Sequence, residues 1–131
     1  MDIQIPEGLE NRIETVVNEK NTAKAHGSGL LDVFATPAMI ALMEETSHKS
    51  IESYLPHGYA SVGTQLNIKH VKATPKGMKV YCISKLQTVE GRKLLFSVEA
   101  YDETDKIGYG LHERYIVETD RFMSKITVNN N

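Results

Sequence analysis

The spacing of apolar residues changes near position 58, and this change limits the folds open to the chain. Residues 36–54 carry apolar side chains at helical spacing, whereas residues 60–119 alternate with a period of two. Short turns that contain Gly, Pro or Asp divide the second region into four strand-like segments. One long helix followed by four strands predicts an α+β domain in which an antiparallel sheet covers a central helix.

An earlier segment, residues 10–18, is rich in Val and Thr and predicts one further strand ahead of a Gly-bearing loop at 20–29. The predicted order is therefore strand, helix and then an antiparallel meander, with meander strands at 61–74, 78–89, 94–102 and 109–119. The hotdog fold, in which the sheet wraps around the helix, has this order of elements.

The first meander strand has one predicted apolar face. Strict alternation places Val62, Thr64, Leu66, Ile68 and His70 on that face, with Gly63, Gln65, Asn67 and Lys69 on the opposite one. We therefore expect His70, at the end of the strand, to lie on the side that packs against the helix.

The helix is predicted to begin with Thr36 as its N-cap and Pro37 as its first helical residue. It should end near Tyr54, where "LPHG" follows. Because its first turns are apolar nearly all round, we expect the first half to be enclosed and the second half to be only partly covered. Glu44 interrupts the apolar part, and a carboxylate there needs a hydrogen-bond donor or a proton.

Composition narrows the function classes. A chain of 131 residues, 40% hydrophobic and 24% charged, is typical of one domain, which we expect to span residues 1–131. The net charge of −2 provides no basic field for nucleic acid. The absence of a basic, apolar leader and of long apolar runs predicts a cytoplasmic protein with no membrane partner. The single cysteine and the unpaired histidine spacing predict no metal site.

Four polar residues are candidates for chemistry, although each has a simpler explanation. Glu44 could be a solvated boundary residue, Thr36 a helix cap, His70 a hydrogen-bonded structural group, and Arg114 an ion-pair partner at a sheet edge. Thr36 and Glu44 are eight residues apart, so both project to roughly the same side of the helix. If the strand that carries His70 packs on that side, a hydroxyl, a carboxylate and an imidazole converge.

Such a group suits acyl transfer or ester hydrolysis. The amides and the positive dipole at the helix start would stabilise an oxyanion at the same place. A carboxylate or an imidazole supplies the general base, and a hydroxyl can act as a nucleophile or hold water.

Four sequence runs, "VFATPAMIALMEETSHKSI", "GTQLNIKHVKATPKGMKV", "VEGRKLLFSVEAYD" and "IGYGLHERYIV", resemble the hotdog-fold acyl-CoA thioesterases typified by fluoroacetyl-CoA thioesterase. The resemblance covers roughly residues 30–125. It implies a thioesterase that hydrolyses a small acyl-CoA to free acid and CoA, with no cofactor beyond the CoA of the substrate. It also implies a homodimer with its site at the subunit interface.

The resemblance also implies roles for individual residues. Thr36, Glu44 and His70 match the family's catalytic group, Gly63 and Arg114 match residues that line or support the acyl site, and Phe34 lies beside them. Two mechanisms are open: Glu44 acts as general base on a water held by Thr36 and His70, or an acyl-enzyme forms on Thr36 or Glu44. Arg114 is expected to orient or neutralise the carboxylate.

The chain departs from the family upstream of the helix. The stretch "AHGSGLLD" has no aromatic residue before Phe34, so fluoroacetate selectivity is not expected, and Pro37 removes one amide donor from the helix start. A non-catalytic protein that binds acyl-CoA or another small ligand is the alternative, and a hydratase on the same scaffold is less favoured. Several basic side chains could either bind the phosphates of CoA at the rim of the site or form an ordinary solvated face. They are Lys69, Lys72, Lys76, Lys79 and Arg92.

Overall fold

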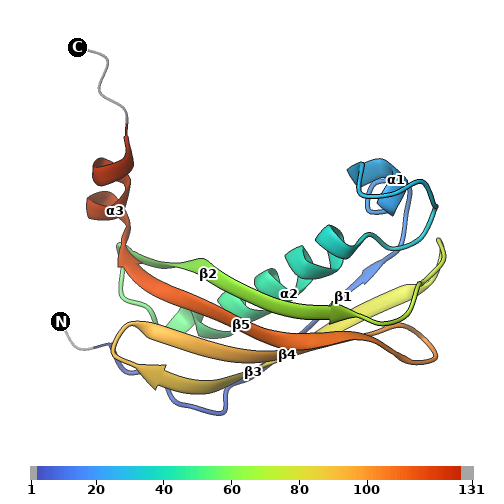
Figure 1. Ribbon diagram of the computed structural model, residues 1–131. Helices are drawn as coiled ribbons and strands as arrows, with labels where there is room; N and C mark the ends of the chain where they lie inside the picture. The colour runs from blue at the N-terminus through green and yellow to red at the C-terminus, as the bar shows by residue number, and fades with distance from the viewer. Residues whose placement is uncertain (1–2, 128–131) are drawn as a thin grey trace.

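The computed structural model describes residues 3–127 and shows a five-stranded antiparallel sheet wrapped around one long helix (Figure 1). This confirms the predicted α+β architecture. In chain order the elements are β1 (Glu10–Val16), α1 (Ala23–His26), α2 (Thr36–Ile51), the 3-10 turn η1 (Glu52–Tyr54), β2 (Tyr59–His70), β3 (Lys79–Glu90), β4 (Lys93–Tyr101), β5 (Lys106–Glu118) and α3 (Thr119–Ile126).

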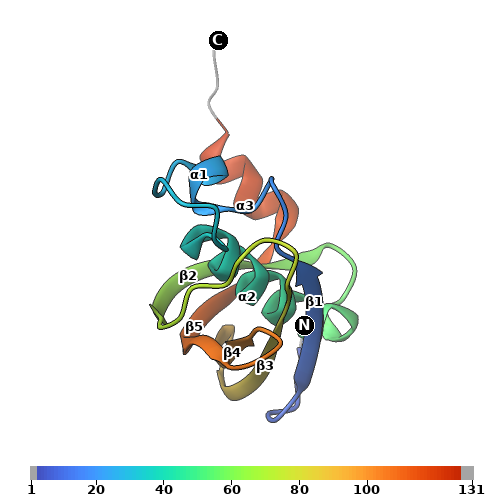
Figure 2. The same ribbon diagram turned by 90° about the vertical axis from the view of Figure 1, so that its right-hand side faces the viewer.

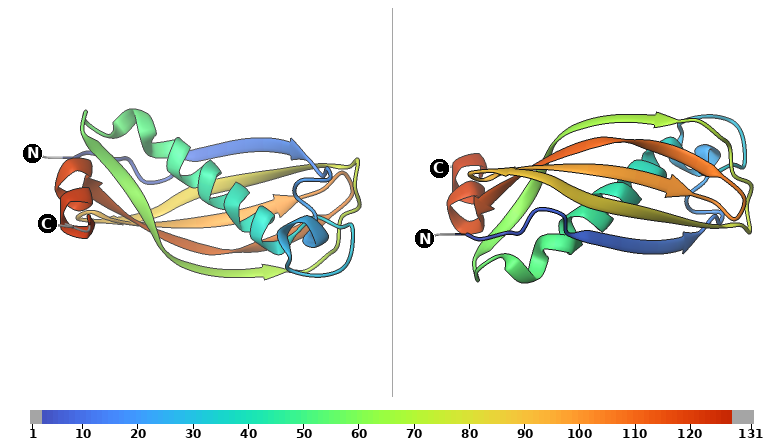
Figure 3. Two further views of the ribbon diagram at one scale, coloured as in Figure 1. Left: turned by 90° about the horizontal axis from the view of Figure 1, so that it is seen from above. Right: turned by 90° about the horizontal axis from the view of Figure 1, so that it is seen from below.

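The strands lie in the order β1-β3-β4-β5-β2, and all neighbours are antiparallel. The predicted four-stranded meander is therefore wrong in part, because only β3, β4 and β5 follow one another in space. β2 pairs with β5 at one edge, while β3 pairs with β1 near the other edge (Figure 3). Residues 71–78 connect β2 to β3 across the end of the sheet, where the amides of Val71 and Lys72 donate to the carbonyl of Ile107.

Helix α2 lies against the concave face of the sheet, between β1 and β2 (Figures 2 and 3). Its buried face meets apolar side chains of β3, β4 and β5 in one continuous core. Burial follows one face along the whole helix, which corrects the expectation of an enclosed first half: Ala41 is exposed, whereas Ile51 in the last turn is fully buried. The buried residues of α2 are Met39, Leu42, Met43, Thr46, Ser47 and Ile51.

Two polar residues on this buried face are satisfied within the helix. The hydroxyl of Thr46 donates to the carbonyl of Leu42 (2.7 Å), and the hydroxyl of Ser47 donates to the carbonyl of Met43 (2.8 Å). A buried hydroxyl without a partner would destabilise the fold, so these bonds permit a helix of mixed polarity to pack against the sheet.

A β-bulge at Thr64 changes the side-chain pattern of β2. Gly63 pairs with Arg114, but the next pair joins Gln65 to Glu113, so Thr64 is the extra residue. Directly opposed residues share a face of an antiparallel sheet, so Gly63 lies on the helix side together with His70. The prediction that placed Gly63 on the opposite face is therefore wrong, because strict alternation does not include a bulge.

Helices α1 and α3 were not predicted from the sequence. α1 is four residues long, and the hydroxyl of Thr22 caps it by accepting from the amide of Ala25 (3.2 Å). α3 follows β5 directly and contains no buried residue. No helix within residues 3–127 is long and apolar enough to cross a membrane.

We predict that Gly110→Ala destabilises the fold by about 2–3 kcal/mol. A Cβ atom at Gly110 would lie 2.0 Å from the carbonyl oxygen of Asn67, so the β2 and β5 backbones would have to separate. Gly29→Ala is the control, because its Cβ would lie 3.4 Å from Ala23 Cβ, and it should change the free energy of unfolding by less than about 0.5 kcal/mol. Urea unfolding measures both, and equal costs would contradict the close approach.

Candidate active site

Thr36 and His70 form the first part of the candidate site. Thr36 Oγ1 lies 2.7 Å from His70 Nδ1, so the predicted pairing of these residues is present in one chain. Thr36 is the first residue of α2 and is exposed, whereas His70 is the last residue of β2 and is half-buried. Burial lowers the pKa of His70 below its usual value, which favours the neutral imidazole that a general base requires.

The hydroxyl of Thr36 does not cap helix α2, so it is available to the site. The N-cap of α2 is Ala35, and no side chain caps the helix, so the prediction of Thr36 as N-cap is wrong by one residue. Its hydroxyl bonds to the imidazole instead. The Nε2 atom of His70 is buried and has no hydrogen-bond partner among the described residues.

A cavity of about 320 Å³ lies next to this pair. Thr36, His70, Phe34, Val71 and Lys72 are among the residues that line it. Phe34 is 2% exposed, so it forms part of the core as well as the cavity wall. An acyl group bound here would meet the Thr36 hydroxyl and one apolar wall.

Glu44 belongs to a second group of residues, in the third turn of α2. Its Oε2 atom lies 3.9 Å from Nη1 of Arg114, and its side chain is 38% exposed. A Cβ atom at Gly63 would lie 2.9 Å from the same carboxylate oxygen. Glycine at position 63 therefore leaves room for the Glu44 carboxylate beside Arg114, because a Cβ atom there would displace the tip of the glutamate side chain.

Arg114 is fixed by hydrogen bonds on three of its nitrogens. Its Nε donates to Ser61 Oγ (2.8 Å) and its Nη2 donates to the carbonyl of Ser61 (2.9 Å). Its Nη1 donates to Nε2 of His112 (3.1 Å), because arginine has no acceptor. This planar fork holds the guanidinium in one orientation toward Glu44.

His112 is consequently a neutral imidazole of defined tautomer. Since Nε2 accepts from Arg114, Nδ1 carries the proton and donates to the carbonyl of Gln65 (2.9 Å), next to the bulge. Burial lowers the pKa of His112, and the positive charge of Arg114 lowers it further. Protonation would remove the acceptor that Arg114 uses.

One chain holds these residues as two separate groups. Thr36 and Glu44 are eight residues apart on α2, which is about 12 Å along the helix axis. His70 is the last residue of β2, whereas Gly63 lies seven residues earlier, near the middle of the strand. Within the described residues, no group of three or more His, Cys, Asp or Glu has the arrangement of a metal site.

Comparison with known proteins identifies the family of this chain. Residues 17–120 match the family described as "FlK: Fluoroacetyl-CoA-specific thioesterase". The chain belongs to this thioesterase family. It is 40% identical over 95 residues to the fluoroacetyl-CoA thioesterase of Streptantibioticus cattleyicolor, an alignment that covers 72% of this chain and 68% of that relative.

Solved structures of related proteins confirm the hotdog thioesterase fold. The fluoroacetyl-CoA thioesterase FlK superposes with a TM-score of 0.88 at 32% identity, covering 94% of this chain and 96% of FlK. A mutant of FlK in complex with fluoroacetate and CoA has a TM-score of 0.85 at 33% identity, over 90% and 99% of the two chains. A thioesterase superfamily member from Thermus thermophilus, TTHA0967, gives 0.86 at 31% identity, over 93% and 90%.

Two residues outside the predicted site hold the Glu44 group of this thioesterase. Ser61 bonds twice to Arg114, and His112 precedes Arg114 by two positions on the same face of β5. The period of two on β5 could have pointed to His112. No signal in the sequence joins Ser61 to Arg114, because the contact spans 53 residues.

We predict that neutral His112 makes stability depend on pH. The pKa of His112 is lower in the folded chain than in the unfolded chain. Its contribution to the free energy of unfolding is therefore fully present above about pH 6.5. That contribution is lost as the pH falls through the folded pKa, because the unfolded chain binds the proton more readily. His112→Gln cannot titrate and should flatten the decline in urea midpoint between about pH 7 and pH 5. An equally steep decline in both proteins would contradict this assignment.

Proposed function

We propose that this protein hydrolyses a small acyl-CoA thioester to the free acid and CoA, with Thr36, His70 and Glu44 as its catalytic residues. The observation that carries the proposal is the 2.7 Å contact between the exposed Thr36 hydroxyl and His70, at the start of the central helix of a hotdog thioesterase. A hydroxyl and an imidazole at this distance are a nucleophile and base pair, or a joint holder for water.

The start of α2 supplies donors for the oxyanion. The first amide bonded within the helix is that of Met39, which donates to the carbonyl of Ala35 (2.9 Å). Pro37 has no amide hydrogen, so the amides of Thr36 and Ala38 are the first-turn donors ahead of the helical ladder. These two amides, together with the helix dipole, would hold the thioester oxygen as it gains negative charge.

Glu44 completes the chemistry by either of two routes. As general base it takes a proton from water, whose oxygen adds to the carbonyl carbon, and the C–S bond then breaks to release the CoA thiolate. In the second route the Thr36 oxygen attacks the carbonyl carbon while His70 takes its proton, and the C–S bond breaks to release the CoA thiolate. Glu44 then takes a proton from a water molecule, which hydrolyses the acyl-enzyme. The thiolate is a good leaving group, so neither route needs a cofactor. Arg114 keeps the carboxylate oriented in both.

The acyl group is expected to be small, because the family of this chain is described by its action on fluoroacetyl-CoA, a short acyl thioester, and the open pocket of about 320 Å³ beside Thr36 accommodates such a group. Apart from the imidazole of His70, the aromatic side chain in its wall is that of Phe34. The stretch "AHGSGLLD" before Phe34 offers no other aromatic residue to close around a fluorine atom. We therefore propose a small acyl-CoA without selectivity for fluoroacetyl-CoA.

We further propose a homodimer in which each site combines residues of both chains. β2 is an edge strand, and residues 63–67 along it are exposed. If β2 pairs antiparallel with its copy about a two-fold axis near Leu66 and Asn67, His70 comes beside Gly63 of the partner subunit. The pair formed by Thr36 and His70 would then meet Glu44 of the partner subunit, which removes the separation along one helix.

The buried, unpaired Cys82 fits a reducing compartment, so we place the protein in the cytoplasm. Burial raises the pKa of the Cys82 thiol to about 11, and it therefore stays an unreactive core residue there.

Hydrolysis of a panel of short, branched and aryl acyl-CoA thioesters, followed by thiol detection, tests the function. We predict turnover by the wild type and a loss of kcat/KM of about 100-fold or more for Glu44→Ala and Thr36→Ala. Glu45→Ala is the matched control, because Glu45 is the neighbouring carboxylate and pairs only with Lys49 among the described residues. A wild type that binds acyl-CoA without hydrolysing any would support the non-catalytic alternative.

Mixing two inactive variants tests the shared site. We predict that Thr36→Ala and Glu44→Ala proteins, unfolded together and refolded, recover about a quarter of wild-type activity. Half of the dimers would be mixed, and one of their two sites would contain both intact residues. If all three residues acted within one chain, no mixture would recover activity.

A further inference from the structure

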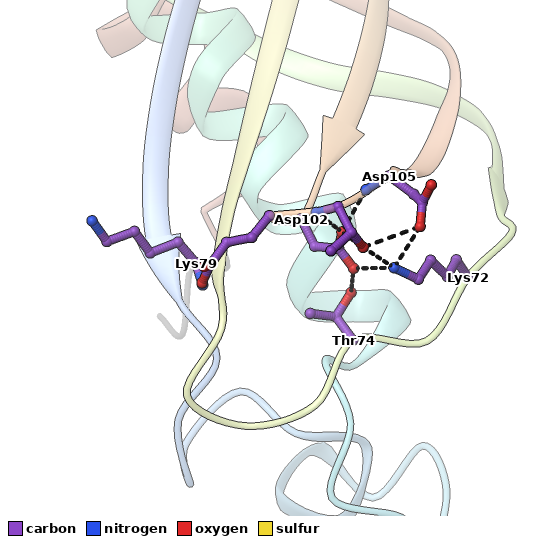
Figure 4. Close-up of polar contacts among 7 residues, drawn as sticks. Lys72, Thr74, Lys79, Asp102 and Asp105 are labelled. Atoms are coloured by element: carbon purple, nitrogen blue, oxygen red, sulfur yellow. Dashed lines mark hydrogen bonds and ion pairs between the residues drawn. The ribbon is translucent and has the colours of Figure 1, made fainter.

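Asp102 is a buried carboxylate at the turn between β4 and β5, outside the two groups of site residues. Its side chain is fully buried, and it accepts five hydrogen bonds (Figure 4). Burial alone would raise its pKa, but the ammonium of Lys72 and the amides of Thr104 and Asp105 hold the pKa well below its usual value. Asp102 is therefore ionised at neutral pH.

The two oxygens of Asp102 hold different segments. Oδ1 accepts from the amides of Thr104 and Asp105, both at 2.8 Å, and so fixes its own turn. Oδ2 accepts from Lys72 Nζ (2.9 Å) and from the hydroxyl of Thr74 (3.0 Å), both in the segment that crosses from β2 to β3. The carboxylate thus ties the crossing segment to the rigid β4–β5 hairpin.

The crossing segment is linked to both members of the Thr36 and His70 pair through residues close to them in the chain. Lys72 follows His70 by two residues. The carbonyl of Thr74 accepts from the amide of Phe34 (2.8 Å), two residues before Thr36. The Asp102 carboxylate, together with the carbonyl of Ile107, therefore holds the segment that sets the end of β2 relative to the start of α2.

We propose that Asp102 is a positioning residue for thioester hydrolysis, acting through Lys72 and Thr74 to keep Thr36 and His70 at hydrogen-bond distance. This inference rests on the proposed function. The ends of helices and strands fray, and Thr36 and His70 are both terminal residues of their elements. A displacement of about 1 Å between reacting groups can lower a rate by about 100-fold.

The same contacts argue against one of the two explanations offered for Lys72, which was a contact with the phosphates of CoA. Its ammonium lies 2.9 Å from both Asp102 and Asp105, and the hydrogen bond that it donates to Asp102 is the main cause of its raised pKa. A lysine that is paired with two carboxylates is a poor partner for a CoA phosphate. Lys72 is better explained as the link between Asp102 and the end of β2.

Two variants of Thr74 separate positioning from stability. Thr74→Val keeps the buried volume but removes the donor to Asp102, whereas Thr74→Ser keeps the donor and loses a methyl group. Both should lower stability, since Thr74 is fully buried. We expect Thr74→Val to lower kcat about 10-fold or more with a smaller change in KM, and Thr74→Ser to stay within about 2-fold of wild type.

Asp102→Asn should act in the same direction as Thr74→Val, with a larger loss of kcat. Glu99→Gln is its control, because Glu99 also pairs with a lysine of the β4–β5 hairpin, Lys106, but has no contact with Lys72 or Thr74 among the described residues. It should leave kcat and KM unchanged. Equal kcat for the two Thr74 variants, or an equal loss in Glu99→Gln, would overturn the proposal.

A second measurement separates this inference from the proposed function. The ¹⁵N shift of His70 Nδ1 reports its hydrogen bond with Thr36 whether or not the protein is active. We expect that shift to move in Thr74→Val and to be retained in Thr74→Ser. An inactive wild type with this NMR pattern would reject the proposed hydrolysis alone, whereas an unchanged shift in Thr74→Val would reject the positioning role of Asp102.

Discussion

The structure depends on the burial of one face of α2 against the concave side of the sheet. Met39, Met43 and Ile51 are fully buried along this face, so the helix can neither rotate nor slide without exposing apolar surface. This constraint fixes where the other residues of α2 lie. Thr36 is held at the end of β2, and Glu44 is held beside Gly63 and Arg114.

The polar groups of the site differ in how firmly they are held. Arg114 is buried and bonded to Ser61 and His112, and Asp102 is buried and bonded to Lys72 and Thr74. Glu44 and Thr36, which would act on substrate, are exposed or half-exposed. Reactive groups that are open to solvent are thus supported by buried groups with satisfied hydrogen bonds, an arrangement that gives a site fixed geometry.

Much of the fold could be predicted because helix α2 and the strands have clear hydrophobic periods. The order of the strands could not, since a period of two shows that a segment is extended but does not show which neighbour it joins. The bulge at Thr64 was missed because a period of two assumes unbroken alternation along the strand. The bulge places Gly63 on the helix side of the sheet and not on the opposite face. Thr36 was misassigned as N-cap because its partner, His70, is 34 residues away.

Thr36, Glu44, His70, Gly63 and Arg114 were predicted from their spacing and from a family resemblance, and their catalytic and binding roles stay predictions. Asp102 was not singled out, because an aspartate in a turn is ordinary and its burial appears only in the folded chain. Asp102 differs from other aspartates in turns by its tertiary contacts and not by its residue type, so the sequence alone does not identify it.

The most direct test of the central claim, that two chains complete each site, is the crystal structure of the assembled protein. The account predicts a two-fold dimer through the β2 edges, in which Thr36 lies within reach of one bridging water from Glu44 of the partner subunit. A dimer through the β1 edge or the outer sheet face, with Thr36 remote from that carboxylate, would contradict it.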